Sequence, residues 1–509
     1  MIQLSIVSYT LLAALAALVV ALAIDVFRRR RLQTKQALLI GQDELPEAPG
    51  PRSWPLIGSM HLLGGYEVPY AAFTDLAKRY GPVINLHLGN QKCLVVNGLN
   101  NIKEVLIAKG AHFDGRPNFA RFHQLFCGDK ENSLAFCDWS ELQKTRREML
   151  RAHTFPQSFS ARFSHLDSFV AEEMHDLTAR LDATAGASTA IKPELIHACA
   201  NIFSAYFCSK KFDRHDAAFN HTLDIFDSIF YEVNQGCAAD FLPWLLPFHS
   251  KQMAQMKQWS HEIRQFMETH IINDRLTRRR QGLVSQEESG DYIEALLEHV
   301  ESQQKEKLLT LDSAMFALED IVGGHSAVAN LLVKALGFVA SRPEVQERVK
   351  AEADLVTGNG ARPLTLQDRP VMPYTDAVIL EAIRMISSPI VPHVANQDSS
   401  IAGYKIEKDT LIFLNNHELN TSDKLWDEPS KFKPERFLST GRLIKPEHFL
   451  PFGVGRRSCM GYKMVQFLSF SILGTLLQKY RLEPEQDYKV PVGDLALPKD
   501  TFKFKFIAH

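Results

Sequence analysis

The chain of 509 residues has the composition of a folded protein, with 45% hydrophobic and 23% charged residues. This balance excludes a disordered chain, which could not bury enough apolar surface to offset its ordering entropy. Basic and acidic residues number 57 and 59, so the basic excess typical of nucleic-acid-binding proteins is absent and we expect no nucleic-acid partner. Seven cysteines are too few for a disulfide framework, and the length suggests about three domains.

Residues 1–27 are predicted to form a membrane anchor helix. No charged side chain occurs before Asp25, and residues 11–24 are an unbroken run of Leu, Ala, Val and Ile. With the preceding residues, this run reaches the roughly 20 residues needed to cross a bilayer. A cleaved signal peptide would carry its charge before the apolar run, whereas here Arg28–Arg31 follow it. Basic residues at this flank stay cytosolic, so we expect a single-pass anchor; the alternative is a buried N-terminal helix.

Residues 28–58 are predicted to be a basic and proline-rich linker. Prolines at 46, 49, 51 and 55 exclude a helix there and indicate a semi-rigid spacer. From 59 to 509 the sequence shows neither a second linker nor an internal repeat. The initial expectation of three domains therefore gives way to an anchor, a linker and one domain.

Most of that domain is predicted to be helical, with short strands at its edges, so the fold class is mainly α with small β-sheets. A hairpin is expected from 83–88 and 92–97, and further strands at 401–406, 410–414 and 501–507. Helices are predicted at 68–80, 162–184, 249–279, 311–341, 343–355, 374–386 and 462–479. The apolar loop Phe241–Phe248, broken by two prolines, is either part of the core or an exposed segment that dips into a membrane interface.

The stretch Phe452–Gly461 reads F-x-x-G-x-R-x-C-x-G. A thiolate iron ligand needs a turn that presents its sulfur and surrounds it with backbone N–H donors. Gly455 and Gly461 permit such a close backbone approach, and the helix predicted to follow Cys459 favours a thiolate through its N-terminal dipole. Arg457 could meet an anionic group of a bound cofactor. The alternative is a buried cysteine in a glycine turn.

This motif resembles the haem-binding signature of the cytochrome P-450 superfamily, and the resemblance extends over essentially the whole chain. It implies the P-450 fold, with haem b held between a long central helix and the loop of Cys459, the axial ligand of the iron. It also implies a monooxygenase that uses O2 and NADPH. Within the motif, the resemblance places Phe452, Gly455 and Gly461 at the cofactor and makes a haem propionate the partner of Arg457.

Other cofactor and structural residues follow from the same resemblance. His393 is expected at the second propionate. Glu381, Arg384 and Arg436 resemble the family's buried ionic triad, which is structural. Trp139 is expected at the haem, but Gln143 and Lys144 occupy the positions where the family carries its arginine. Arg146 is taken as the haem contact in its place, with Arg147 as the open alternative because both can share a helical face with Trp139.

The oxygen-activating helix departs from the family pattern of a small residue, glycine, any residue, an acid and threonine. Gly323, Gly324, Ser326 and Ala327 occupy these catalytic positions, so the acid and the threonine are absent. Adjacent glycines inside a helix cost about 1 kcal/mol each, which indicates a functional kink beside the iron. Proton delivery is left to Ser326, His325, ordered water or the substrate, and His325 is favoured as structural.

The Gly-Gly-His-Ser-Ala-Val-Ala-Asn segment resembles that of the insect Spook and Spookier enzymes of the Halloween group. This implies a sterol monooxygenase in the early "black box" steps of ecdysteroid biosynthesis from 7-dehydrocholesterol. The alternatives are a haem-thiolate isomerase or rearranging enzyme that needs no external electrons and a non-enzymatic haem- or sterol-binding protein. The expected partners are an NADPH-dependent cytochrome P-450 reductase, with cytochrome b5 as a further donor, and the lipid of the endoplasmic reticulum membrane, with the catalytic domain in the cytosol.

Overall fold

The computed structural model describes residues 45–286, 288–302, 309–491 and 495–509. The predicted anchor at 1–27 and the first part of the predicted linker lie outside the described residues. In the described part, helices dominate and the strands are short, which confirms the predicted fold class. The helices are α2 (Pro69–Tyr80), α3 (Leu99–Lys103), α4 (Ala120–Leu125), α5 (Glu141–Thr154), α6 (Ala161–Ala183), α7 (Ile191–Cys208), α8 (Ala217–Asn234), α9 (Ser250–Met267), α10 (Asn273–Arg280), α11 (Tyr292–Ser302), α12 (Leu311–Gly323), α13 (His325–Ala340), α14 (Pro343–Thr357), α15 (Pro373–Ile386), α16 (Asn416–Thr421) and α17 (Tyr462–Lys479).

The strands form one four-stranded sheet, in the order β1-β2-β7-β4, and three smaller sheets. In the larger sheet β1 and β2 form the predicted hairpin, while β2 and β7 run parallel. The strands are β1 (Val83–Leu88), β2 (Gln91–Val96), β3 (Thr189–Ala190), β4 (His393–Val394), β5 (Ser399–Ile401), β6 (Tyr404–Ile406), β7 (Leu411–Leu414), β8 (Leu438–Ser439), β9 (Arg442–Leu443), β10 (Tyr480–Pro484) and β11 (Lys503–Ala508).

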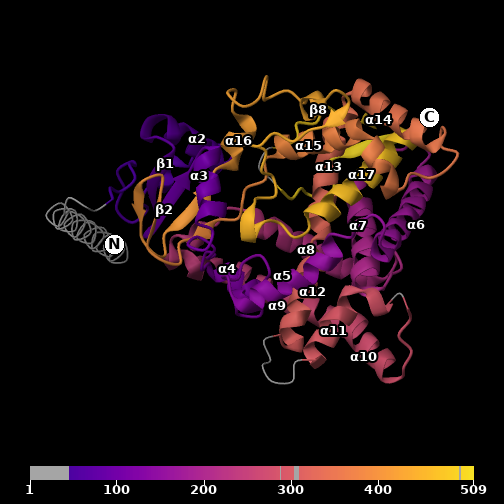
Figure 1. Ribbon diagram of the computed structural model, residues 1–509, viewed down its shortest axis with the longest axis horizontal. Coiled ribbons are helices and arrows are strands. Elements are labelled where there is room, and N and C mark those ends of the chain that lie inside the picture. The colour runs from indigo at the N-terminus through magenta and orange to yellow at the C-terminus, as the bar shows by residue number, and fades with distance from the viewer. Residues whose placement is uncertain (1–44, 287, 303–308, 492–494) are drawn as a thin grey trace, which may run out of the picture.

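Figure 1 shows the β1–β2 hairpin with α2 and α3 at one end of the long axis and the helical part at the other. Helix α13 packs against α7, α15 and α17 and so lies at the centre of the helical part. Within the described residues, only Leu311–Ala340 is long and apolar enough to cross a membrane, but 78% of its apolar window is buried inside the protein. It is therefore the central core helix.

Two predicted elements are wrong in detail. The strand expected at 401–406 is a β5–β6 hairpin, because Ala402 and Gly403 adopt positive φ values of 51° and 80° and turn the chain. The helix expected at 249–279 is interrupted by a π-helical turn at Glu268–Ile272 between α9 and α10.

The described part of the predicted linker packs on the β-sheet. The amide of Asn85 donates to the carbonyl of Pro49 at 2.9 Å, and that of Lys405 donates to Pro46 at the same distance. A Cβ at Gly50 would lie 1.9 Å from the Asn85 oxygen, so only glycine allows this approach. Residues 46–50 are thus held by the body of the protein.

Candidate active site

A cavity of about 460 Å³ lies between the C-terminal end of α15, the loop 451–461 and the middle of the α12–α13 helix. This volume is in the range of small-molecule sites. Most of the wall is apolar. The apolar lining residues include Leu134, Leu150, Phe203, Phe230, Ile321, Val328, Leu331, Ile383, Ile386, Ile390, Val391 and Leu495.

The loop before α17 presents Cys459 to this cavity. The amide of Cys459 donates to the carbonyl of Phe452 at 2.9 Å, which closes the turn. Gly455 has a φ of 75°, and a Cβ there would lie 2.1 Å from the Leu106 oxygen, so no other residue fits. The side chain of Cys459 is exposed because it faces the cavity.

The surroundings of the thiol combine burial with donors. Burial raises the pKa of the Cys459 thiol, while the amides of Gly461 and Tyr462 and the Arg147 guanidinium act in the opposite direction. A Cβ at Gly461 would meet no protein atom within 4 Å, although the residue lines the cavity. The loop therefore leaves space beside the sulfur that protein side chains do not fill.

Three buried or half-buried arginines line the cavity near this loop. Arg457 donates to the carbonyls of Asp114 and Cys137, at 2.6 Å in each case, and its Nη1 is buried without a partner. Arg147 donates to the Ser458 carbonyl at 2.6 Å, and Arg116 to the Val391 carbonyl at 3.1 Å. In the described chain no carboxylate pairs with the side chain of any of these arginines.

The positive charges of this cluster repel one another. Burial, followed by the charge of Arg457, lowers the pKa of Arg116 to about 9 and that of Arg147 to about 10. Burial and the Arg116 charge also lower the pKa of His393 well below its usual value, and its Nδ1 lies 2.6 Å from the Phe113 oxygen.

Haem fits these residues. Its two propionates would supply the missing negative charge and a partner for Arg457 Nη1. Cys459 would bind its iron, and the open space at Gly461 would take the edge of the macrocycle. Phe452, Arg457, His393, Cys459 and Gly461 line this cavity together, whereas Gly455 lies outside its lining.

The structure separates the two candidate arginines of α5. Arg146 is fully buried away from the cavity and donates to the carbonyls of Asn132 and Glu131 at 2.9 and 3.0 Å. Arg147 lines the cavity and Arg146 does not. The prediction that Arg146 faces the haem site is therefore wrong, and Arg147 takes that place. The two side chains differ because one helical residue changes direction by about 100°.

Trp139 lies behind the cavity wall. The guanidinium carbons of Arg456 and Arg457 lie 5.0 and 5.5 Å from the centre of its ring. Stacking of this kind attracts the cations to the indole face. Trp139 therefore acts on the site by holding Arg457, and the cavity lining does not include it.

The α12–α13 helix is interrupted at Gly324, whose amide donates to Ile321 three residues back at 3.1 Å. This tightened turn agrees with the predicted kink. Gly324 and Ala327 line the cavity together with Val328. Neither Ala327 nor Val328 carries a polar atom in its side chain, so this part of the wall offers no proton.

Gly323 and Ser326 point away from the cavity, contrary to their predicted place in the oxygen groove. A Cβ at Gly323 would lie 2.8 Å from the ring of Phe226, so this glycine allows α8 to approach α12. The Ser326 hydroxyl lies 3.3 Å from His325 Nε2, and His325 Nδ1 lies 2.7 Å from the Val322 oxygen. Burial lowers the pKa of His325 to about 4, so the ring is neutral and structural.

Sequence reasoning missed Asp320, which lines the cavity from one turn before Gly324. It is the one carboxylate among the described lining residues. Its Oδ2 accepts from the Leu134 amide at 2.5 Å and from the Ser133 hydroxyl at 3.0 Å, and burial raises its pKa to about 6. The spacing of four residues to Gly324 was the signal that could have revealed it.

The predicted triad is assembled at the far side of α15. Arg384 Nε lies 2.8 Å from Glu381 Oε2, and Arg436 Nε lies 3.1 Å from Glu381 Oε1. Both arginines also lie over the ring of Trp426, and Glu381 and Arg384 are fully buried. The triad fixes the segment of Arg436 against α15 and does not line the cavity.

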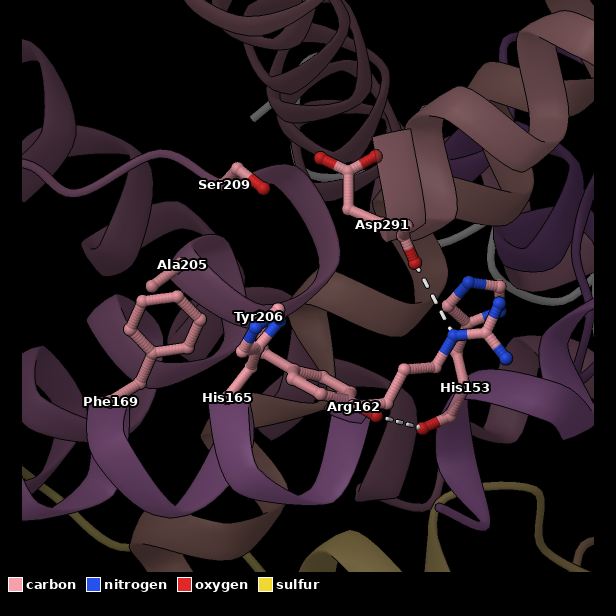
Figure 2. Close-up of a pocket in the computed structure, with 9 residues that line it drawn as sticks. His153, Arg162, His165, Phe169, Ala205, Tyr206, Ser209 and Asp291 are labelled. Carbon is pink, nitrogen blue, oxygen red and sulfur yellow. Dashed lines mark hydrogen bonds between the residues drawn. The ribbon is translucent and has the colours of Figure 1, made fainter. Parts of the chain in front are cut away.

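A second pocket lies between α5, α6, α7 and the residues before α11, and Figure 2 shows its lining. Arg162 donates to the Gly290 carbonyl at 3.3 Å, and Tyr206 donates to the His153 carbonyl at 2.7 Å. Its volume of about 20 Å³ leaves room for about one water molecule. Burial lowers the pKa of His153 to about 4, so its ring is neutral. The pocket is too small for a substrate.

Comparison with known proteins agrees with this site. The model of the family described as "Cytochrome P450" matches residues 48–506. The chain is 38% identical to cytochrome P450 307a1 of Drosophila melanogaster, with 97% of this chain and 96% of that protein covered. It is 31% identical to the steroid 17-alpha-hydroxylase/17,20 lyase of Rana dybowskii, over 87% and 85% of the two chains. The chain therefore belongs to the cytochrome P450 family, whose members are monooxygenases that bind haem through a cysteine thiolate.

Proposed function

We propose that this enzyme is a sterol monooxygenase that acts on 7-dehydrocholesterol in the early steps of ecdysteroid biosynthesis. The observation that carries the proposal is the apolar cavity next to Cys459, with Asp320 as its single carboxylate. A sterol is a rigid apolar body with one hydroxyl group, so such a wall matches it in chemistry. The similarity to an insect relative and to an enzyme named as a steroid hydroxylase supports the same substrate class.

Each part of the site has a task in this reaction. Haem, when bound, supplies the activation of dioxygen with electrons from a redox partner. Cys459 would hold its iron, and Arg116, Arg147, Arg457 and His393 would hold its propionates. The apolar side chains of α13 exclude water and orient the sterol, while Asp320 can accept a hydrogen bond or exchange a proton at its carboxylate oxygen.

The partner and membrane contacts are part of the proposal. Lys144, Arg151 and Arg456 are exposed, and we assign to them the docking of an NADPH-dependent reductase, with cytochrome b5 as a further donor. Trp244 and Phe248, 57% and 82% exposed, support insertion of the 241–248 segment into the endoplasmic reticulum membrane next to the anchor. We also propose the anchor at 1–27 and a single catalytic domain, to which residues 46–50 of the predicted 28–58 linker are joined by hydrogen bonds.

A second candidate is a rearranging enzyme that needs no external electrons. It is favoured by one observation, the absence of the family's acid at Ser326 and of its threonine hydroxyl at Ala327. An isomerisation within the sterol would make no demand on that proton relay.

The test uses the full-length enzyme in lipid vesicles with reductase, NADPH and 7-dehydrocholesterol. Sterol oxidation that requires NADPH is the expected result, and turnover without NADPH would instead establish the rearrangement. The Cys459→Ala variant serves as the control: it should lack the red-shifted band of the reduced, CO-bound thiolate haem and should be inactive. A wild-type enzyme that binds CO normally and leaves the sterol unchanged would overturn the proposed substrate.

A further inference from the structure

A buried polar cluster lies behind the α13 wall of the cavity. The ammonium of Lys192 on α7 lies 2.6 Å from Asp227 Oδ2 on α8, and it also donates to the carbonyl of Leu497. The amide nitrogen of Asn330 on α13 donates to Asp227 Oδ1 at 3.0 Å and to the Ser326 carbonyl at 2.8 Å. The Leu497 amide returns a hydrogen bond of 3.0 Å to Asn330 Oδ1.

This ion pair is costly to bury. The exposed fractions of Lys192, Asp227 and Asn330 are 2%, 8% and 0%. The loss of hydration of two charges offsets most of their attraction, so apolar residues of similar size would stabilise the fold equally well. The best-attested role of such a pair is to fix one arrangement of packed elements.

The elements that the cluster joins are those that build one side of the cavity. Helix α8 contributes Phe230, the C-terminal segment contributes Leu495, and α13 contributes Val328. Helix α8 also approaches α12 closely, because the ring of Phe226 fills the space that a side chain at Gly323 would need. A shift of α8 or of the C-terminal segment would therefore move the wall.

We propose that Asp227 is a positioning residue that, by binding Lys192 and Asn330 together, fixes Phe230 and Leu495 relative to α13 and sets the cavity's fit to a bulky ligand. It touches neither substrate nor cofactor and acts through these two lining residues. The sterol specificity of the enzyme then depends on a group outside the cavity.

The surface offers a matched control. Lys499 pairs with Asp224, which lies one turn before Asp227 on α8, so this pair joins the same helix to the same C-terminal segment. Its side chains are 55% and 57% exposed, and exposed pairs contribute little. If any ion pair between α8 and the C-terminal segment could fix the wall, removing this outer pair would change the fit of the cavity as much as removing the inner pair of Lys192 and Asp227.

The experiment compares Lys192→Met/Asp227→Leu with Lys499→Met/Asp224→Leu in the haem-loaded enzyme. Binding of imidazole and of clotrimazole, a small and a bulky ligand of haem iron, is titrated by the shift of the haem absorption band. In the inner double variant we expect clotrimazole to bind about tenfold more weakly, which equals about 1.4 kcal/mol, with imidazole affinity within about twofold of wild type. The outer double variant should bind both ligands as wild type does.

A single variant covers the case in which the double variant fails to fold. Asp227→Asn keeps the shape of the side chain but leaves the Lys192 charge without its counter-ion, so it should lower the melting temperature and also weaken clotrimazole selectively. Unchanged clotrimazole affinity in a folded inner variant, or an equal loss for both ligands, would overturn the proposal. Since azoles bind the haem of any P450, the result is independent of whether 7-dehydrocholesterol is the substrate.

Discussion

The cavity is bounded by two walls that are built in opposite ways. The loop of Cys459 and its neighbours present cations and backbone groups, and Gly455 is required there by its positive φ. The α12–α13 wall is mostly apolar, with Asp320 as its one carboxylate and Lys334 as its one cation among the described lining residues. The first wall binds a charged cofactor through fixed turns, whereas the second shapes the space for an apolar substrate.

The difference shows where local sequence determines a site. In the Cys459 loop, the motif itself specifies the turn, so the residues between Phe452 and Gly461 are placed by their spacing. On α12–α13 the side chain that meets the cavity depends on helix rotation, and an error of one residue changes its direction by about 100°. The two walls should therefore respond differently to substitution.

The largest expected effect is at the ionic triad that supports α15 behind the first wall. Glu381→Ala leaves the buried charges of Arg384 and Arg436 unpaired and should lower the free energy of unfolding by about 3–5 kcal/mol. Urea unfolding of the haem-loaded enzyme measures this. The control is Glu435→Ala at the exposed pair with Arg348, which should cost less than about 1 kcal/mol. Equal costs at the two pairs would contradict the assignment of the triad as a buried support.

Substitution of Asp320 is expected to raise the free energy of unfolding, by less than the loss expected at Glu381. Its pKa in the folded enzyme is about 6, above the ordinary 3.8, so the native state binds the proton more tightly than the unfolded chain does. The contribution of Asp320 to the free energy of unfolding therefore falls as the pH rises from about 4 to about 6, and it stays low above pH 6. Asp320→Asn removes the charge but still accepts from Leu134 and Ser133, so it should stabilise the enzyme above pH 6 by up to about 3 kcal/mol.

Urea unfolding at pH values on either side of 6 measures this difference, which should shrink toward zero near pH 4. A gain in stability accompanied by a loss of sterol turnover would indicate that the carboxylate is kept for function. A variant that is less stable at every pH would show that Asp320 is a structural anchor for the loop of Leu134 and nothing more.

The two arginines of α5 test the charged wall at single-residue resolution. Arg147→Gln removes a cation that lines the cavity, and a hydrogen bond to a charged group is worth about 1.5–3 kcal/mol, so haem loss should accelerate about tenfold or more. Arg146→Gln should leave the rate of haem loss within about twofold while lowering stability, because the carbonyls of Glu131 and Asn132 lose their donor. Transfer of haem to apomyoglobin measures both rates, and faster loss from the Arg146 variant would reverse the correction.

Much of the site could be predicted from the sequence, but not its arrangement on helices. The Cys459 loop, His393 and the Glu381 triad were predicted from motifs that resemble the family's. Within them, spacing alone links Glu381 to Arg384, three residues apart on one helix. Arg116 and Asp320 carry no motif, because their place on the wall follows from loop and helix packing between distant segments. Gly323 and Ser326 were assigned to the cavity by pattern, and the packing of Phe226 against Gly323 shows why the helix faces the other way.

The smallest effect is expected where the sequence departs most from its family. Ala327→Thr adds a hydroxyl to the apolar wall, and this hydroxyl can bond back to the carbonyl of Gly323 four residues earlier. If the enzyme already delivers protons by another route, the yield of product per NADPH should change less than about twofold, far below the roughly 10²–10⁴-fold that a positioned general acid contributes. Val328→Thr, which keeps nearly the same side-chain shape and also lines the cavity, is the control for the position of the hydroxyl. A large gain in yield from either variant would show that the missing hydroxyl limits the reaction and that the apolar wall is incomplete for oxygen chemistry.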